Sequence, residues 1–172
     1  MSLLPENDRQ EQVAEYQHSL ELLETLPLFK GLPGRVLKLL SFLCEKGVYA
    51  AGDTLLGQGD DPGLAVYVMT GEVKALPPQD SDADTVTGFT AGAFLCGLSL
   101  LGSMPSFYTL EAVDKTEVLL LRRDQFQSII EKFPEVAPLL IQTILRLIRE
   151  WDSDQLYTKE GHPGREYGIT LL

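Results

Sequence analysis

The sequence predicts a mainly β domain, either a sandwich or a barrel, with helices on both sides of it along the chain. Between residues 47 and 122 glycine recurs every few residues and separates short segments rich in Val, Tyr, Thr and Leu, as in strands joined by turns. No segment in this region is long enough for a crossover helix, which argues against a parallel sheet. The stretches before and after it have apolar residues at helical spacing.

The length and composition indicate one folded domain with helical extensions. The 172 residues suit a single hydrophobic core, and the 44% of hydrophobic and 23% of charged residues are typical of a folded globular chain. The formal net charge of -11 repels the phosphate backbone of nucleic acids. We therefore expect no nucleic-acid partner.

Two helices are expected before the β region. Apolar residues recur at steps of three and four from about residue 8 to 26, as in an amphipathic helix. After a short break at 28–32, Pro33 is well placed to start a second helix that ends near Lys46 and Gly47. The apolar positions are Val13, Tyr16, Leu20 and Leu23 in the first helix and Val36, Leu37, Leu40 and Leu43 in the second.

Seven short strands and one polar loop are expected in the β region. The loop is the Pro-rich and Asp-rich segment 77–82. The strands are expected at 47–49, 54–58, 64–70, 72–76, 84–89, 108–112 and 117–122.

Two helices are expected after the β region. Asp124 is placed to cap the first, with Gln127 three residues later, and Pro134 interrupts it. The second runs from about 135 to 157 and has apolar residues on more than one face, whereas packing on one domain buries a single stripe. Two explanations stay open: the same helix of a second subunit covers the surplus, or the N-terminal helix of the same chain does.

The cellular setting follows from the cysteines and from the apolar stretches. Cys44 and Cys96 each lie in an apolar segment without metal-ligand spacing, which predicts buried thiols in a reducing compartment. The N-terminus has no signal-peptide pattern, and the most apolar late stretch is broken by Gln142 and Arg146. We therefore expect a cytoplasmic protein with no membrane partner.

Three segments resemble the cyclic-nucleotide-binding domains of the catabolite activator protein and of cyclic-nucleotide-dependent kinases. They are LPLFKGLP at 26–33, AAGDTLLGQGDDPGLAVYVMTGEVKA at 50–75 and TAGAFLCGLSLLGSMPSFYTLEAVDKTEVLLLRRDQFQSII at 90–130. The resemblance implies a double-stranded β-helix, or jelly-roll barrel. It also implies four parts: an N-terminal helix at 1–25, the barrel domain at 26–133, a dimerisation-type helix at 134–157 and a tail at 158–172.

The phosphate-binding cassette of this family corresponds to residues 95–108 and differs from the family pattern where charge is needed. The family reads approximately Phe-Gly-Glu-Leu-Ala-Leu-Leu and then Pro-Arg-Ser/Thr-Ala, where the Glu binds the ribose and the Arg binds the cyclic phosphate. Gly97 stands at the Glu position and Ser106 at the Arg position, and no Lys or Arg occurs from Ala75 to Asp114. Loss of such an Arg costs about 2–5 kcal/mol. We therefore expect binding of cyclic AMP or cyclic GMP in the family's manner to be lost.

A residual pocket is still expected in the cassette, and the role of its hydroxyl groups has two possible explanations. The hydroxyls of Ser99, Ser106 and Thr109 either contact a small ligand or are ordinary turn and strand polarity. The expected pocket residues are Phe94, Gly97, Leu98, Ser99, Ser106, Phe107 and Tyr108.

No enzyme chemistry, metal site or cofactor is expected. His18 lies on the polar side of a helix and His162 in the tail, and no nucleophile has an accompanying base. The acidic clusters Asp60–Asp61 and Asp80 to Asp84 could attract a cation, but they lack the oxygen spacing of a calcium loop and are more often solvated turns. The expected function is a non-enzymatic regulatory domain that acts through protein contacts, as a homodimer and with a further protein partner. The alternative is a sensor that still takes a cyclic nucleotide or another small molecule in the same pocket.

Overall fold

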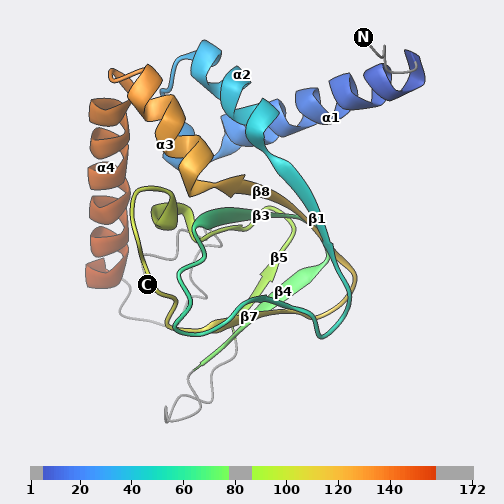
Figure 1. Ribbon diagram of the computed structural model, residues 1–172. Helices are drawn as coiled ribbons and strands as arrows, with labels where there is room; N and C mark the ends of the chain where they lie inside the picture. The colour runs from blue at the N-terminus through green and yellow to red at the C-terminus, as the bar shows by residue number, and fades with distance from the viewer. Residues whose placement is uncertain (1–5, 78–86, 158–172) are drawn as a thin grey trace. The chain divides into compact units, whose positions relative to one another are not determined.

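The chain divides into two compact units, each described here by itself. The structure is a computed structural model that describes the backbone of residues 6–77 and 87–157 and the side chains of residues 13–77 and 87–150. The β unit is continuous in sequence, from Glu45 to Ser128. Among the described residues, the helical unit combines residues 6–44 with residues 129–157 (Figure 1).

The β unit consists of two four-stranded sheets in which all paired strands are antiparallel (Figure 1). The first sheet has the order β1-β8-β3-β6, namely Glu45–Tyr49, Thr116–Arg122, Leu64–Thr70 and Phe94–Leu95. The second has the order β2-β7-β4-β5, namely Thr54–Leu56, Thr109–Ala112, Glu72–Leu76 and Thr87–Thr90. The sequence order is mixed in both sheets, as expected for a jelly roll.

The core of the β unit lies between the two sheets and draws residues from both. Val68 of β3 stands opposite Val118 of β8 in the register, and both side chains are fully buried. Both faces of β3 and β8 carry buried residues, such as the neighbours Ala65 and Val66 in β3 and Val118 and Leu119 in β8, although successive side chains of a strand point to opposite faces. The buried core cluster is Leu56, Val66, Val68, Val73, Ala93, Leu95, Leu110 and Val118.

The turn between β3 and β4 is held against the turn between β7 and β8. Gly71 has a φ of +85°, a conformation that glycine adopts without steric cost. The Asp114 carboxylate accepts a hydrogen bond from the Glu72 N–H at 3.0 Å. The fully buried Thr116 donates its hydroxyl to the Glu72 carbonyl at 3.1 Å. The two turns therefore form one polar junction at the end of the sheets.

The helical unit has a core made from both of its chain segments. Its elements are α1 (Glu6–Thr25), the 3-10 helix η1 (Pro27–Phe29), α2 (Gly34–Leu43) and α4 (Val136–Tyr157), together with the end of α3 (Arg123–Lys132), which begins in the β unit. Helix α1 packs on α2, and α4 packs on η1. The buried apolar residues include Leu23, Leu26, Leu28, Phe29, Val36, Leu40, Val136 and Leu140.

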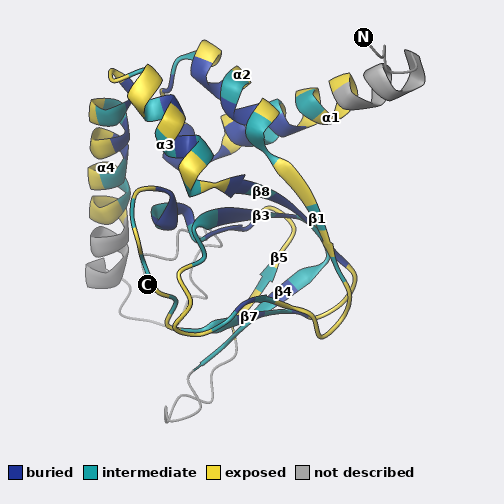
Figure 2. Ribbon diagram, in the orientation of Figure 1, coloured by how far each residue is buried: buried dark blue, intermediate teal, exposed yellow. Residues whose placement is uncertain are grey.

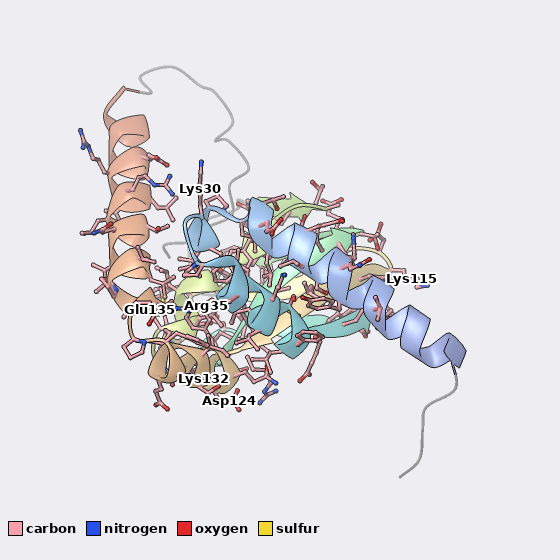
Figure 3. The ribbon with its side chains drawn as sticks, turned by 90° about the horizontal axis from the view of Figure 1, so that it is seen from above. Lys30, Arg35, Lys115, Asp124, Lys132 and Glu135 are labelled. Carbon is pink, nitrogen blue, oxygen red and sulfur yellow. The ribbon has the colours of Figure 1, made fainter. Side chains whose placement is uncertain are left out.

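Three polar or aromatic contacts link the segments of the helical unit. The Thr143 hydroxyl in α4 donates to the Lys30 carbonyl at 3.5 Å. The Arg35 side chain of α2 forms an ion pair with Glu135, and Figure 3 shows these two residues next to each other. The rings of Tyr16 in α1 and Phe42 in α2 stack at 3.9 Å.

The predicted mainly β fold with flanking helices is confirmed, while several element bounds were wrong. The second helix ends at Leu43 rather than near Lys46, because Glu45 starts β1 and pairs with Leu120 of β8. Strand β2 ends at Leu56, and neither β6 nor η1 was predicted. Part of the strand expected at 84–89 lies outside the described residues, and β5 begins at Thr87.

One side-chain prediction was also wrong. Asp124 lies inside the first turn of α3 and pairs with Arg122 at 3.6 Å, because α3 follows β8 directly and leaves no residue to form the expected cap. Cys44 and Cys96 are free cysteines of intermediate exposure, and burial raises the pKa of both thiols.

Candidate functional site

The cassette connects the two sheets through one tight turn and one loop. It begins with Leu95 in β6, continues through the 3-10 helix η2 (Gly97–Leu100), and reaches β7 at Thr109. The Ser106 N–H donates to the Asp60 carbonyl at 2.9 Å, and the Gly59 N–H donates to the Ser106 carbonyl at 2.8 Å. The cassette loop is therefore fixed to the β2–β3 connection by backbone hydrogen bonds.

A small pocket lies in the cassette and has an uncharged lining. It encloses about 20 Å³, room for about one water molecule and far below the roughly 300–1,000 Å³ of small-molecule pockets. It is lined by Pro62, Cys96, Leu98, Ser99, Met104, Pro105, Ser106 and Tyr108.

Four of the seven expected pocket residues line this pocket: Leu98, Ser99, Ser106 and Tyr108. The other three do not. Phe94 and Gly97 are buried beside each other, and the Phe107 side chain is 64% exposed. The sequence did not point to the lining residues Pro62, Cys96, Met104 and Pro105.

Gly97 leaves no room for an acidic side chain at this position, where the sequence resemblance predicts one in the family. A Cβ atom added to Gly97 would lie 2.6 Å from Cε1 of Phe94, closer than packed carbon atoms allow. Phe94 is itself 6% exposed. The aromatic ring therefore fills the space in which a carboxylate would begin.

The hydroxyl groups of the cassette are used by the chain itself. The Ser99 hydroxyl is hydrogen-bonded to the carbonyls of Leu64 at 2.6 Å and Cys96 at 2.7 Å. The Ser106 hydroxyl donates to the Tyr108 carbonyl at 2.7 Å. The Thr109 hydroxyl accepts from the Gln58 N–H at 3.1 Å. These contacts favour the reading of the three hydroxyls as turn and strand polarity.

Replacing Ser99 by alanine should therefore act on stability. Ser99 is 2% exposed, and its loss removes a donor from the Leu64 carbonyl, which costs about 1–3 kcal/mol. Chemical denaturation should show the same loss of unfolding free energy for Ser99→Ala with and without cyclic AMP. The matched control is Ser128→Ala, because the exposed Ser128 donates to the Gln125 carbonyl at 2.7 Å, and a surface change costs within about 0.5 kcal/mol. Equal losses in the two variants would contradict a structural role of Ser99.

Arg123 brings a cation to the back of the cassette, where it pairs with Asp61, an exposed residue of the acidic turn predicted at Asp60–Asp61. Arg123 Nη1 donates to Asp61 Oδ2 at 2.8 Å, and its Nη2 donates to Asp61 Oδ1. Its Nε donates to the Ser99 carbonyl. The side chains are 18% exposed for Arg123 and 29% for Asp61. The guanidinium is thus paired within the chain and does not line the pocket.

A family model for the cyclic nucleotide-binding domain matches residues 46–133. The chain belongs to this family. The matched residues include β1 except for Glu45, the described strands β2 to β8 and the whole cassette. The two sheets with flanking helices agree with the jelly-roll fold of the cyclic nucleotide-binding domain.

Two curated relatives share parts of their length with this cyclic nucleotide-binding domain. The chain is 30% identical over 128 residues to the cyclic AMP receptor protein of Thermus thermophilus, a match that covers 73% of this chain and 59% of that protein. It is 26% identical over 116 residues to a patatin-like phospholipase domain-containing protein of Caenorhabditis elegans. That match covers 57% of this chain and 9% of the relative. The chain therefore spans less than two thirds of either relative.

Solved structures show the same fold over most of their own length. The N-terminal domain of a transcriptional regulator from Streptomyces coelicolor superposes with a TM-score of 0.67 at 25% identity, covering 82% of this chain and 99% of that one. A cyclic nucleotide-binding-like protein from Brucella abortus gives 0.60 at 27% identity, covering 66% and 98%. These relatives connect the cyclic nucleotide-binding fold with regulatory proteins.

Cys96 occupies the glycine position of the family's cassette and keeps the conformation that a glycine would favour. Its φ of +58° is the single positive value at a non-glycine residue in the described part of the chain. Such a left-handed backbone costs an ordinary residue about 1–2 kcal/mol. Burial raises the pKa of the Cys96 thiol to about 11, opposed by a hydrogen bond with Tyr108. The thiol is therefore protonated near neutral pH.

Neither metal binding nor membrane crossing is indicated within the described residues. No three His, Cys, Asp or Glu side chains among them come close enough together to hold an ion. The described helices also include none with the length and apolarity needed to span a bilayer.

Proposed function

We propose that this domain is a non-enzymatic regulatory module that acts through protein contacts and no longer binds cyclic nucleotides in the family's manner. One observation carries the proposal: the cassette pocket has no charged residue in its lining. Gly97 and Ser106 stand where the family has Glu and Arg, and the space at Gly97 is filled by Phe94. A cyclic phosphate would enter this pocket without a counter-charge.

The absence of a cation in the pocket has a large expected effect on phosphate binding. Removing the charged partner of a buried ionic contact costs about 2–5 kcal/mol. Since each 1.4 kcal/mol is about a factor of ten, the missing Arg alone weakens phosphate binding roughly thirty- to several-thousand-fold. Arg123 does not compensate, because its guanidinium is held by Asp61.

Isothermal titration with cyclic AMP and cyclic GMP tests the proposal. We expect no saturable heat at micromolar nucleotide, whereas the cyclic AMP receptor protein of Thermus thermophilus, titrated in parallel with cyclic AMP, serves as the positive control. Saturable micromolar binding by this domain would overturn the proposal. That result would support the alternative function, a sensor that binds a cyclic nucleotide in the cassette.

The lining of the pocket favours a second candidate, a sensor whose pocket widens around an uncharged ligand. Leu98, Met104 and Tyr108 give the pocket apolar walls, and small-molecule sites are mostly apolar with few polar groups. A thermal-shift panel of neutral and anionic small molecules separates the two candidates. Stabilisation by neutral compounds that is abolished by Met104→Trp, which fills the pocket, would favour the sensor.

A second copy of the same chain is the partner that α4 supports. The inner stripe of α4, Val136, Leu140 and Thr143, is buried within the helical unit. Ile141, Leu145 and Ile148 form an outer stripe at helical spacing and are 58%, 61% and 42% exposed (Figure 2). An apolar stripe of this kind is typical of a helix that packs on a partner. We propose that the outer stripes of two copies pair.

Light scattering of wild type and Leu145→Glu tests this homodimer. We expect the wild type to give twice the 19.0 kDa mass of the chain and Leu145→Glu to give the monomer mass, because a carboxylate in an apolar interface is strongly unfavourable. Gln142→Glu adds the same charge at an exposed position beside the stripe and should stay dimeric. A monomeric wild type, or a dimeric Leu145→Glu, would contradict the dimer.

The charges of the chain do not favour a nucleic-acid partner. The chain carries a net charge of -11. In the β unit, Lys46, Lys74, Arg122 and Arg123 each form an ion pair with an acidic side chain. Since nucleic-acid affinity rests mostly on unneutralised cations, this surface favours a protein partner.

A further inference from the structure

One carboxylate near the cassette collects more hydrogen-bond donors than a surface ion pair would. Both terminal nitrogens of Arg123 donate to Asp61. The Ser103 hydroxyl also hydrogen-bonds to it. The N–H groups of Gly63, at 3.3 Å, and Met104, at 3.4 Å, point to Asp61 Oδ1. Guanidinium, hydroxyl and backbone N–H groups are the donors that proteins use to hold oxyanions.

These donors come from three separate segments. Gly63 belongs to the β2–β3 connection, Ser103 and Met104 to the cassette loop, and Arg123 to the junction of β8 and α3. Arg123 also donates its backbone N–H to the Gly63 carbonyl at 2.8 Å and its Nε to the Ser99 carbonyl. The carboxylate is therefore the point at which the three segments meet.

We propose that the β unit contains an anion site behind the cassette and that Asp61 of the same chain is the anion bound in it. The carboxylate neutralises Arg123 and orders the cassette loop without any added ligand. Asp60, the adjacent residue in the chain, takes no part, because the Asp60 carboxylate oxygen Oδ2 lies over Gly57 instead. The strength of the contact is reflected in the pKa of Asp61, which the Arg123 hydrogen bond, followed by that from Ser103, holds well below its usual range.

This anion site goes beyond the proposed loss of nucleotide binding and does not depend on it. Neither Asp61 nor Arg123 lines the cassette pocket. A nucleotide titration could succeed or fail without changing the donors around Asp61. Removal of the carboxylate, in contrast, should leave a vacated site that fits a small oxyanion such as formate.

Chemical rescue of Asp61→Ala tests the proposal. We expect the Tm of Asp61→Ala to lie about 3–12 °C below that of the wild type, because charge-assisted hydrogen bonds are lost from a chain of this size. Adding sodium formate should restore at least half of the loss, compared with sodium chloride at the same ionic strength, because a ligand that binds only the folded state stabilises it. Asp60→Ala is the matched control and should show neither the loss nor a formate-specific gain.

Two further variants keep the test decisive. Arg123→Gln in the Asp61→Ala background removes the main donor and should abolish the formate effect, while Arg122→Gln in that background should preserve it. If Asp61→Ala does not fold without formate, Asp61→Asn is used for hydrogen exchange. The Gly63 and Met104 amides should then exchange about tenfold faster or more, with the Val68 and Val118 amides unchanged. Rescue without Arg123, a formate effect equal in Asp60→Ala, or unchanged exchange would each overturn the proposal.

Discussion

Gly71→Ala should lower the free energy of unfolding more than any other glycine-to-alanine change in the described β unit. The φ of +85° is unfavourable for alanine by about 1–2 kcal/mol. The added Cβ would also lie 2.7 Å from each of three oxygens, those of Asp114, Lys115 and Thr116. Overpacking of this kind costs about 1–3 kcal/mol more. Urea denaturation should therefore show a loss of about 2–5 kcal/mol.

Gly52→Ala separates backbone strain from the close contacts at Gly71. Gly52 has nearly the same φ, +86°, but a Cβ there meets nothing within 4 Å. Gly52→Ala should lower the free energy of unfolding only by the cost of backbone strain, about 1–2 kcal/mol. If Gly52→Ala and Gly71→Ala lose the same free energy of unfolding, the junction of the two turns does not contribute in the way described here.

Gly97→Ala should destabilise the cassette, and Gly97→Glu should not restore a nucleotide site. A single added methyl group forces the Phe94 ring out of a buried position, at a cost of about 1–3 kcal/mol. A glutamate adds the desolvation of a charge at the buried position beside Phe94. Denaturation should show Gly97→Glu as the less stable variant, and titration of either variant should show no gain in cyclic AMP binding.

A double-mutant cycle attributes this effect to the aromatic ring. Phe94→Leu creates space next to position 97, so Gly97→Ala should cost at least about 1 kcal/mol less in that background. Gly102→Ala, at a glycine with no atom within 4 Å of the added Cβ, is the control and should change stability little. Additive losses at 94 and 97 would contradict the packing described.

The sequence was most informative where glycines and alternating apolar residues mark strand ends. The predicted bounds 64–70 and 72–76 are those of β3 and β4, since Gly71 separates two runs of β-forming residues. It was least informative for β6, where two residues, Phe94 and Leu95, are too few to show any periodicity. The end of α2 was missed because the pairing of Glu45 with β8 overrides local helix preference.

At the cassette, the sequence identified which charges are absent but not how the space is used. Gly97 and Ser106 could be read directly from the family pattern. The ring of Phe94 against Gly97 depends on side-chain packing that no spacing rule describes. The contact of Asp61 with Arg123 joins residues 62 positions apart. Only the folded sheets bring these two residues together, so the acidic cluster at Asp60–Asp61 did not indicate Arg123 as its partner.

The helical unit joins residues that are far apart in the chain, and this affects the order in which the domain can fold. The Thr143 hydroxyl and the Lys30 carbonyl are separated by 113 residues, a long loop to close by chance. Pairing of Glu45 with Leu120 shortens the chain between them to roughly 40 residues, because the intervening β unit is then bypassed. We therefore expect the β1–β8 pair to form before α4 docks on η1, with the slow step of folding in the β unit.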